Sequence, residues 1–409
     1  MRTTQGKVSV LLGMTWSDRR IAIALAAAGA GVYLVAGLGL LTDYDYYGRL
    51  AQALLQGHWW VTEAPPWLNE LVPCGPERWC VVYPPLPAIL AMPLAAALPA
   101  ALAQVLISRI AGGISAGILY LAVRAFGAPR SVAITGALLS TFGTTLFFSS
   151  VDGRSWYAAH AVAMPLLSAA FLFAARGDRA WLVGAAVGMA ALARLPVAAA
   201  APALALLLSR RAGITYPRAL GGVVLGGLPF ALAYIGYDLL QWGSVFNLGY
   251  VQLTQGDVFF TRGLFSPFYL PRHIDAIFLE PPDIVPGTPF FPRPRGIGMS
   301  LFLTTPAFIW IFAGLRSVRR DVGAAAVALA ALLALVPDIF HGTVGFQQFG
   351  YRFSIDAQPF LVTLALMGTA RSGTTWRTRP SWAFVAVVIV SILINVYATI
   401  AITRFDYWQ

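Results

Sequence analysis

The stretch IAIALAAAGAGVYLVAGLGLLTDYDYY, residues 21–47, decides the fold class of this chain. Ile21 to Leu41 carries no charged side chain, and a helix crosses the hydrocarbon core of a membrane with about 20 such residues. Two aspartates and three tyrosines follow directly, where that helix would leave the membrane. The apolar run is longer than the core of a signal peptide, so we expect a permanent first transmembrane span.

The composition agrees with a membrane protein. Of the 409 residues, 58% are hydrophobic and 11% are charged, whereas about a quarter of the residues in a soluble globular protein are charged. This excludes a soluble globular domain, a disordered chain and a nucleic-acid-binding protein. The formal net charge of +11 is explained by topology, because cytoplasmic loops of membrane proteins collect Lys and Arg.

Twelve apolar runs are candidate spans. They are Ile21 to Leu41, Pro85 to Leu102, Ala103 to Val123, Ser131 to Ser149, Tyr157 to Ala175, Trp181 to Ala193, Pro196 to Leu208, Ala219 to Leu239, Gly298 to Leu315, Val322 to Phe340, Ala357 to Gly368 and Trp382 to Ile402. The second run holds four prolines, each of which removes a backbone donor and disturbs the preceding turn. We assign it to an outer hairpin, which leaves eleven transmembrane helices.

With eleven spans and a cytoplasmic N-terminus, the charges separate by side. Seventeen of the 28 basic residues fall in inner segments, and every acidic residue except Asp18, Asp178 and Asp321 falls outside. Counting the proline-rich run as a span would reverse this pattern, against the positive-inside bias. The prediction is an all-α polytopic protein, one integral-membrane domain over residues 1–409, with its functional centre on the outer face.

The outer side comprises residues 42–84, the hairpin 85–102 and residues 241–297, and the first and the third of these are long enough to hold structure. In the first, apolar residues at helical spacing predict an amphipathic juxtamembrane helix from Asp45 to Gln56, ended by Gly57. The third is rich in aromatic residues, prolines and glycines, which is typical of a loop that lies on the membrane surface.

The chain has two cysteines, Cys74 and Cys80, and both lie in the first outer segment. Their spacing, with prolines and a glycine between and beside them, favours a small disulfide-closed loop in an oxidising compartment over two free thiols.

Asp43 and Asp45 are candidate catalytic groups, because carboxylates at a membrane boundary are costly unless solvated or paired, and a sheltered one can act as a general base. For Asp45 a capping box with Thr42 is an equal alternative, since the two fit the S/T-x-x-D/E form. Arg49, one turn further on, is assigned to the acceptor side of the site.

Arg194 lies in the break Ala193-Arg194-Leu195-Pro196, between two runs that are each too short to cross a membrane fully. Non-helical backbone at membrane depth is tolerated only where protein or a water-filled cavity shelters it. An arginine there is a candidate for binding an anionic group, and the alternative is an arginine that reaches out to the interface.

The segment Gln347 to Asp356 is the second candidate for anion binding. Arg352 offers a forked donor for a phosphate, with Tyr351 beside it and His341 upstream. The alternative is an ion pair between Arg352 and Asp356 at i, i+4.

A tight outer turn, Asp152-Gly153-Arg154, contributes two further candidates. Asp152 can assist Asp43 in binding a metal or an acceptor, although an Asx turn explains it equally well, and Arg154 is assigned to the same secondary site. His160, in the next helix, is more readily explained by contacts between helices. Four His and two Cys in all argue against a structural zinc site.

Together these motifs resemble the GT-C superfamily of membrane glycosyltransferases, which use polyprenyl-phosphate-linked sugars on the extracytoplasmic side. The resemblance rests on Thr42 to Gly57, Tyr83-Pro84-Pro85-Leu86-Pro87, Arg109 and Ala193 to Pro196 in the first half. In the second half, Gln348 to Phe353 is similar to a segment of protein-mannosyltransferase-like members.

The resemblance implies inverting sugar transfer at the outer face of a bacterial plasma membrane. Asp43, with Asp45 as its rival, would act as the base, and Arg352, Arg194 and His341 would hold the donor phosphate. The expected partners are a polyprenyl-phosphate sugar, a glycan, lipid or protein acceptor, and membrane lipid. Asp-Tyr-Asp replaces the adjacent Asp-Glu of many members, so the acting carboxylate and the involvement of a divalent metal stay open.

Two other classes of function are retained. A transporter or flippase of lipid-linked saccharides would also use broken helices and a central arginine, but it predicts charged groups on both membrane faces. A catalytically inactive lipid-binding subunit would keep the architecture without turnover.

Overall fold

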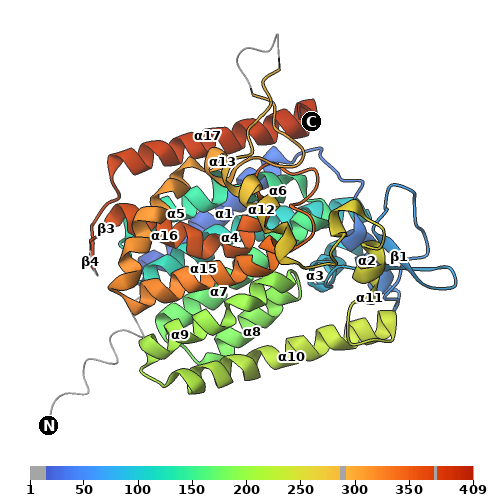
Figure 1. Ribbon diagram of the computed structural model, residues 1–409, viewed down its shortest axis with the longest axis horizontal. Helices are drawn as coiled ribbons and strands as arrows, with labels where there is room; N and C mark the ends of the chain where they lie inside the picture. The colour runs from blue at the N-terminus through green and yellow to red at the C-terminus, as the bar shows by residue number, and fades with distance from the viewer. Residues whose placement is uncertain (1–14, 286–291, 373–374, 409) are drawn as a thin grey trace.

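Apolar helices form the body of the molecule, and a smaller region that contains a strand hairpin lies at one end (Figure 1). The computed structural model describes residues 15–285, 292–372 and 375–408. Within these ranges, eight helices are long and apolar enough to cross a membrane. They are α1 (Trp16–Ala36), α4 (Ala100–Ala125), α7 (Ser155–Arg176), η2 with α9 (Leu195–Ala212), α10 (Tyr216–Trp242), α15 (Val322–Ile339), η7 with α16 (Arg352–Ala370) and α17 (Trp382–Phe405).

A ninth span results if α5 (Arg130–Phe142) and α6 (Leu146–Asp152), which meet at a bend of 48°, are counted together. The predicted helical membrane fold is confirmed, but the count of eleven is not. Helix α8 (Ala180–Ala191) has 12 residues, so it is about 18 Å long at 1.5 Å per residue and falls short of a hydrocarbon core about 30 Å thick.

The predicted span from Gly298 to Leu315 is instead a series of short pieces. It consists of α13 (Leu301–Thr304), η5 (Pro306–Trp310), α14 (Ile311–Gly314) and η6 (Leu315–Arg319). Pro306 begins the second piece, and its missing backbone N–H cannot continue the hydrogen bonding of the first.

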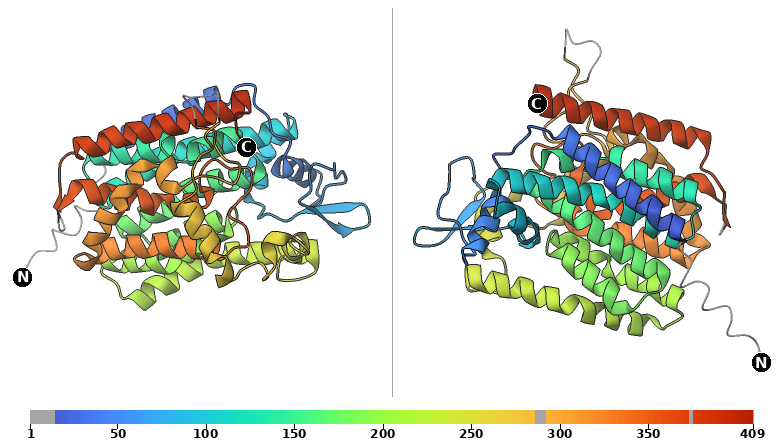
Figure 2. Two further views of the ribbon diagram at one scale, coloured as in Figure 1. Left: turned by 45° about the horizontal axis from the view of Figure 1, so that its top comes forward. Right: turned by 180° about the vertical axis from the view of Figure 1, so that it is seen from behind.

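Helices α7 and α16 form the centre of the bundle, where the most apolar windows are 78% and 94% buried. Helices α10 and α17 lie along opposite edges in every view (Figures 1 and 2). Close packing depends on small residues, as at the crossing of α1 and α4, where a Cβ added to Gly113 would lie 2.2 Å from the backbone N of Ala30.

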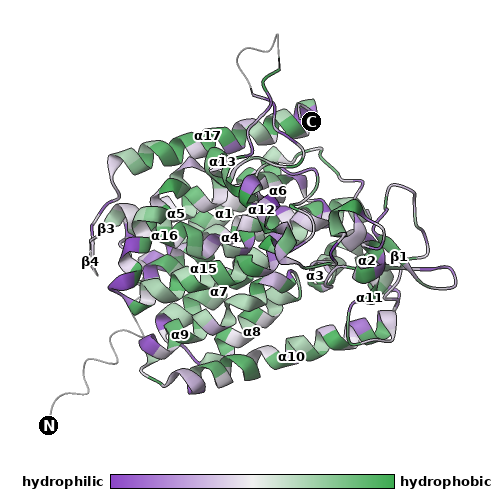
Figure 3. Ribbon diagram, viewed as in Figure 1, coloured by the Kyte–Doolittle hydropathy of each residue, from purple (hydrophilic) through white to green (hydrophobic). Residues whose placement is uncertain are grey.

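One end of the bundle, which we call the arginine end, collects the Arg-rich loops. Arg211 donates to the carbonyl of Phe126 at 2.9 Å, and the rings of Phe126 and Trp376 lie 6.4 Å apart. Arg371 pairs with Asp321 in the same region. Hydrophilic residues also gather there in Figure 3. Arg211 and Arg371 from separate loops therefore meet at this end, while the predicted separation of charge between the two membrane faces stays a prediction.

The opposite end, which we call the hairpin end, is built by α2 (Tyr46–Leu55), the antiparallel strands β1 (Leu71–Gly75) and β2 (Arg78–Val81), and α3 (Leu86–Ala95). A disulfide joins Cys74 to Cys80 across the two strands. The all-α prediction missed this hairpin and the short pair β3 (Arg371–Ser372) and β4 (Thr375–Trp376). Glu77, at φ 54° in the turn before β2, allows the tight reversal that a helical pattern does not anticipate.

The long outer segment contributes short helices, of which the first contacts β1 at the hairpin end and the last packs against α13 and α15. They are α11 (Leu248–Leu253), η3 (Val258–Phe260), η4 (Pro267–Tyr269) and α12 (Leu270–Phe278). Asn247 donates its side-chain amide to the carbonyl of Val82 at 2.7 Å, and Gln241 donates to that of Trp59 at 3.2 Å. Residues 286–291 of the predicted loop 241–297 lie outside the described ranges.

Candidate functional site

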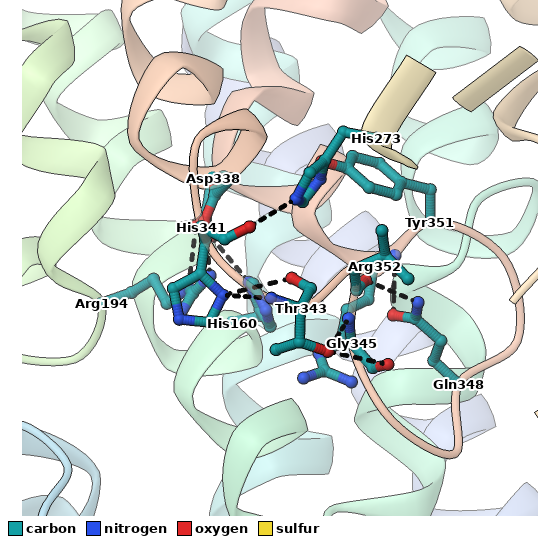
Figure 4. A network of polar contacts seen from close by, with 12 residues as sticks. His160, Arg194, His273, Asp338, His341, Thr343, Gly345, Gln348, Tyr351 and Arg352 are labelled. Atoms are coloured by element: carbon teal, nitrogen blue, oxygen red, sulfur yellow. Dashed lines mark hydrogen bonds and ion pairs between the residues drawn. The ribbon is translucent and has the colours of Figure 1, made fainter. Parts of the chain in front are cut away.

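A buried network of charged side chains joins three distant segments of the chain. Arg194 Nη2 lies 2.7 Å from Asp338 Oδ1, and Arg194 Nε lies 2.8 Å from Asp356 Oδ2. His160 Nδ1 lies 2.7 Å from the other oxygen of Asp356. Figure 4 shows Arg194, Asp338 and His160 close together; they come from the break after α8, from α15 and from α7. His160 thus bridges helices, as the sequence predicted.

Local sequence places these groups at one depth. Arg194 is extended (φ −151°, ψ 100°) in the break before Pro196, where the short α8 ends. Pro337 lies in the last turn of α15, which stops directly after Asp338 and Ile339. Because α8 already ends at Ala191, Arg194 lies in the break that follows it, and its side chain meets Asp338 at the end of α15. The interpretation of Arg194 as a side chain that only reaches out to the interface is wrong.

Two donors of the Arg194 guanidinium, Nε and Nη2, are each paired with a carboxylate, so its positive charge is neutralised within the protein. Asp338 and Asp356 are 2% and 1% exposed. Removing one partner of such a buried pair leaves an uncompensated charge and typically costs about 3–5 kcal/mol. The geometry thus assigns Arg194 to holding η7 (Arg352–Ala357), and its contact with a donor phosphate stays a prediction.

Arg352 is different, because it is buried and carries no carboxylate partner among the described residues. Its Nη1 donates to the carbonyl of Phe346 at 3.0 Å, and its Nε is buried without a hydrogen-bond partner. The guanidinium lies 5.6 Å from the Tyr157 ring and 5.1 Å from the Phe353 ring. The alternative ion pair with Asp356 does not form, because Asp356 is taken by Arg194 and His160. A buried positive charge with free donors is suited to an anionic ligand.

His341, which contacts Thr343 in Figure 4, is surrounded by aromatic rings. The rings of Phe260, Phe265 and Phe353 lie 5.1, 5.8 and 6.1 Å from its imidazole. Burial lowers the pKa of His341 to about 4, and the positive charge of Arg194 acts in the same direction. His341 is therefore neutral at pH 7, so it can meet a phosphate only as a neutral hydrogen-bonding group.

Tyr351, predicted for the same site, is buried and points its hydroxyl at a second histidine. Tyr351 Oη lies 2.8 Å from His273 Nδ1, and His273 Nε2 lies 2.9 Å from the carbonyl of His341. The chain of contacts connects α12 to the segment that carries Arg352. Sequence reasoning missed His273, whose position in an aromatic loop gave no distinguishing signal.

The two predicted catalytic aspartates differ in environment. Asp43 is exposed in the loop after α1, whereas Asp45 is buried and its Oδ1 accepts from Arg49 Nε at 2.7 Å. Burial raises the pKa of Asp45, while Arg49 lowers it. The capping box does not form: Asp45 occupies the N-cap of α2 without a side-chain cap bond, and Thr42 accepts from the backbone N of Tyr44.

Neither aspartate is joined to Arg194 or Arg352 by a hydrogen bond or ion pair in the described parts of the chain. The sequence analysis assigned all four residues to one site, and it could not predict which of them are in contact.

Asp152 and Arg154 form the turn that the alternative interpretation described. Asp152 Oδ1 accepts from the backbone N of Arg154 at 3.1 Å, as in an Asx turn, and also lies 3.3 Å from Arg154 Nε. Arg154 in turn donates to the side chain of Gln347 at 2.5 Å. The carbonyl of Gln347 accepts from Tyr157, against which Arg352 stacks. Arg154 is therefore connected to the Arg352 segment.

A pocket of about 480 Å³ opens on the other side of this turn. Its lining includes Leu41, Asp152, Arg154, Arg404 and Trp408. Leu41 lies two residues before Asp43, so the pocket brings the start of the first outer loop together with the secondary site predicted around Asp152.

Glu70 is a polar residue that sequence reasoning missed, and it contacts Tyr83, which the sequence marked only as the start of the motif Tyr83 to Pro87. The Tyr83 hydroxyl donates to Glu70 Oε2, and the Tyr46 hydroxyl accepts from the backbone N of Glu70 at 3.1 Å. Burial raises the pKa of Glu70, against the Tyr83 hydrogen bond and the positive charge of Arg352. The signal available in the sequence was an acidic residue at the base of the cysteine-closed loop.

The sequence left the involvement of a divalent metal open, and residues 15–285, 292–372 and 375–408 contain no group of three or more His, Cys, Asp or Glu arranged to hold a metal ion. The pairing of Asp43 with Asp152 around a metal thus has no support from the described geometry.

Solved structures with a similar fold are membrane glycosyltransferases. The ArnT structure from Cupriavidus metallidurans, bound to undecaprenyl phosphate, aligns at a TM-score of 0.53 with 14% identity, over 85% of this chain and 59% of ArnT. An Archaeoglobus fulgidus oligosaccharyltransferase in the apo form aligns at 0.45 with 13% identity, over 96% and 57%. No protein-family model and no curated protein sequence matches the chain. The chain spans about three fifths of the length of these proteins. Its fold resembles that of ArnT.

Proposed function

We propose that the protein is a glycosyltransferase that moves a sugar from a polyprenyl-phosphate donor to an acceptor hydroxyl on the extracytoplasmic face. The observation that carries this proposal is the buried guanidinium of Arg352, which has no carboxylate partner among the described residues and keeps free donors. It lies in a fold like that of ArnT, whose structure holds undecaprenyl phosphate.

Arg352 binds the donor phosphate and stabilises the charge that grows on it as the sugar leaves. Arg194 contributes indirectly, because its ion pair with Asp356 holds η7 and so orients Arg352 four residues earlier. His341 donates or accepts a neutral hydrogen bond at the rim of the same site.

The acceptor enters by the pocket lined by Asp152 and Arg154, and a carboxylate of the first outer loop takes its proton. Asp43 is free for this role, while Asp45 is its rival because burial raises its pKa towards the range of a general base. The acceptor oxygen bonds to the anomeric carbon as the bond from that carbon to the phosphate oxygen breaks. The lipid phosphate leaves with the electron pair of that bond, and the configuration at the anomeric carbon is inverted.

The test is donor consumption by purified protein in lipid nanodiscs, with a panel of polyprenyl-phosphate sugars and membrane extract as the source of acceptor. Arg352→Ala should lower turnover about 100- to 1,000-fold, because one preorganised donor to the developing anion is lost. Arg262→Ala, at an exposed arginine of the outer loop, is the matched control. Turnover by Arg352→Ala at the rate of this control would contradict the proposal.

Sugar-lipid movement between leaflets without donor consumption would favour the flippase alternative, and saturable lipid binding without either would favour an inactive subunit. Both outcomes can be measured on the same nanodisc preparation.

A further inference from the structure

Glu70 is a partly buried carboxylate near the Arg352 site to which the proposed reaction gives no task. No basic side chain in the described ranges forms an ion pair with it, and its carboxylate accepts from the Tyr83 hydroxyl. A carboxylate has about four lone-pair positions, and one hydrogen bond from Tyr83 leaves most of them available.

The hairpin end holds this pair rigidly. Glu70 directly precedes β1 and Tyr83 follows β2 by two residues, while Leu71 pairs with Val81 at the base of the hairpin. The Cys74–Cys80 disulfide closes its far end. The side-chain amide of Asn247 fixes the strand that leads to Tyr83 from outside. A site built on strands and a disulfide keeps its geometry better than one on a free loop.

Tyr83 packs against the apolar cluster that contains Tyr157, and the guanidinium of Arg352 lies 5.6 Å from the Tyr157 ring, so Tyr83 and Arg352 both lie against this cluster. The positive charge of Arg352 lowers the pKa of Glu70, against the dominant effect of burial. Burial and the negative charge of Glu70 raise the pKa of Tyr250, and the positive charges of Arg194 and Arg352 act in the opposite direction. Tyr250 is thus within electrostatic reach of the carboxylate and of the two guanidinium groups.

Aromatic rings line the approach to the carboxylate. The ring of Tyr83 lies 5.8 Å from that of Tyr46 and 5.9 Å from that of Tyr47. A sugar has two kinds of surface, hydroxyl groups that donate to carboxylates and C–H faces that pack on aromatic rings. A carboxylate with free lone pairs among tyrosine rings supplies both, next to a group suited to phosphate.

We propose that Glu70, oriented by the hydroxyl of Tyr83, binds hydroxyl groups of the donor sugar whose phosphate is held by Arg352. This inference rests on the proposed function. Glu70 accepts hydrogen bonds from the sugar, Tyr83 orients the carboxylate, and neither takes part in bond breaking.

The experiment compares two ligands, polyprenyl phosphate without a sugar and polyprenyl-phosphate hexose, titrated against protein in nanodiscs. The wild-type protein should bind the hexose form more tightly. Glu70→Gln should reduce that preference at least tenfold, since hydrogen bonds to a charged acceptor are about twice as strong as neutral ones, and should leave the affinity for polyprenyl phosphate unchanged. Glu63→Gln, at an exposed glutamate of the same loop, is the control.

Tyr83→Phe, which retains the ring, provides a second variant and should weaken the same preference by a smaller factor. An unchanged preference in both variants, or an equal loss of affinity for both ligands, would overturn the inference while leaving the proposed function intact. Failure of the wild-type protein to bind either ligand would overturn the proposed function and the inference with it.

Discussion

Replacing Arg194 by Met tests whether this arginine holds the site together or binds the substrate. Met keeps the length and removes the charge, which leaves Asp338 and Asp356 buried without their shared partner. At 2.7–2.8 Å and an effective dielectric constant of about 20, each pair attracts by roughly 6 kcal/mol before desolvation is counted.

The net loss is smaller, because an abandoned carboxylate can take up a proton and the Arg194 side chain is 22% exposed. Breaking a buried pair costs about 3–5 kcal/mol, and the partial exposure places Arg194→Met near about 3 kcal/mol. Denaturant-induced unfolding in mixed micelles, followed by tryptophan fluorescence, measures this difference. Arg262→Met, at an exposed arginine, should change stability by less than about 0.5 kcal/mol.

The triple variant Arg194→Met, Asp338→Asn, Asp356→Asn separates charge from packing. Neutral amides no longer need the guanidinium, so this variant should recover at least half of the lost stability. A stability of Arg194→Met within 1 kcal/mol of the wild type would refute the reasoning, since the carboxylates would then be satisfied without the arginine. In that case Arg194 would be free for a ligand.

Three further predictions follow from single contacts. The pKa of His341 is about 4 in the folded protein and about 6.5 unfolded, so the unfolded chain binds more protons between these values; stability should fall by about 2 kcal/mol from pH 7 to pH 5, and His341→Phe should flatten that slope in the same unfolding assay. Gly113→Ala forces a Cβ into the backbone of α1 and should cost about 1–3 kcal/mol in thermal denaturation, whereas Gly31→Ala, with no atom within 4 Å, should be neutral. Asp43→Asn should lower transfer about 100- to 10,000-fold if it is the base, with Asp45→Asn less affected; unchanged transfer in both would exclude this mechanism.

The helical membrane fold could be predicted because it depends on local composition. A long apolar run such as Tyr216–Trp242 is recognised as a membrane span whatever its neighbours are. Arg-rich loops at alternate connections indicate that these loops lie at the same end of the bundle. The number of crossings could not be predicted, because runs of 12 or 13 residues have the same hydropathy whether they cross or turn back. The length of α8 and the break at Pro306 decide it in the folded chain.

The candidate site was predicted by residue type but not by partner. The sequence marked Arg194, Arg352 and His341 because polar groups beside apolar runs need a reason to be there. It suggested that Asp356 pairs with Arg352, its neighbour on a helix, and the structure pairs it with Arg194 and His160 instead. Spacing in the sequence indicates which residues could pair within one helix, but the packing of different helices determines which pairs form.

By itself, the sequence of this protein determined that it lies in a membrane, because 58% hydrophobic residues in long runs require a lipid environment. The uneven distribution of arginine along the chain also indicates that the two ends of the bundle differ. Only the tertiary structure decided which buried charges cancel and which one is left over. That outcome depends on which helix ends meet at one depth, because buried charges act over a few ångströms and residues such as Arg194 and Asp356 come from segments far apart in the chain.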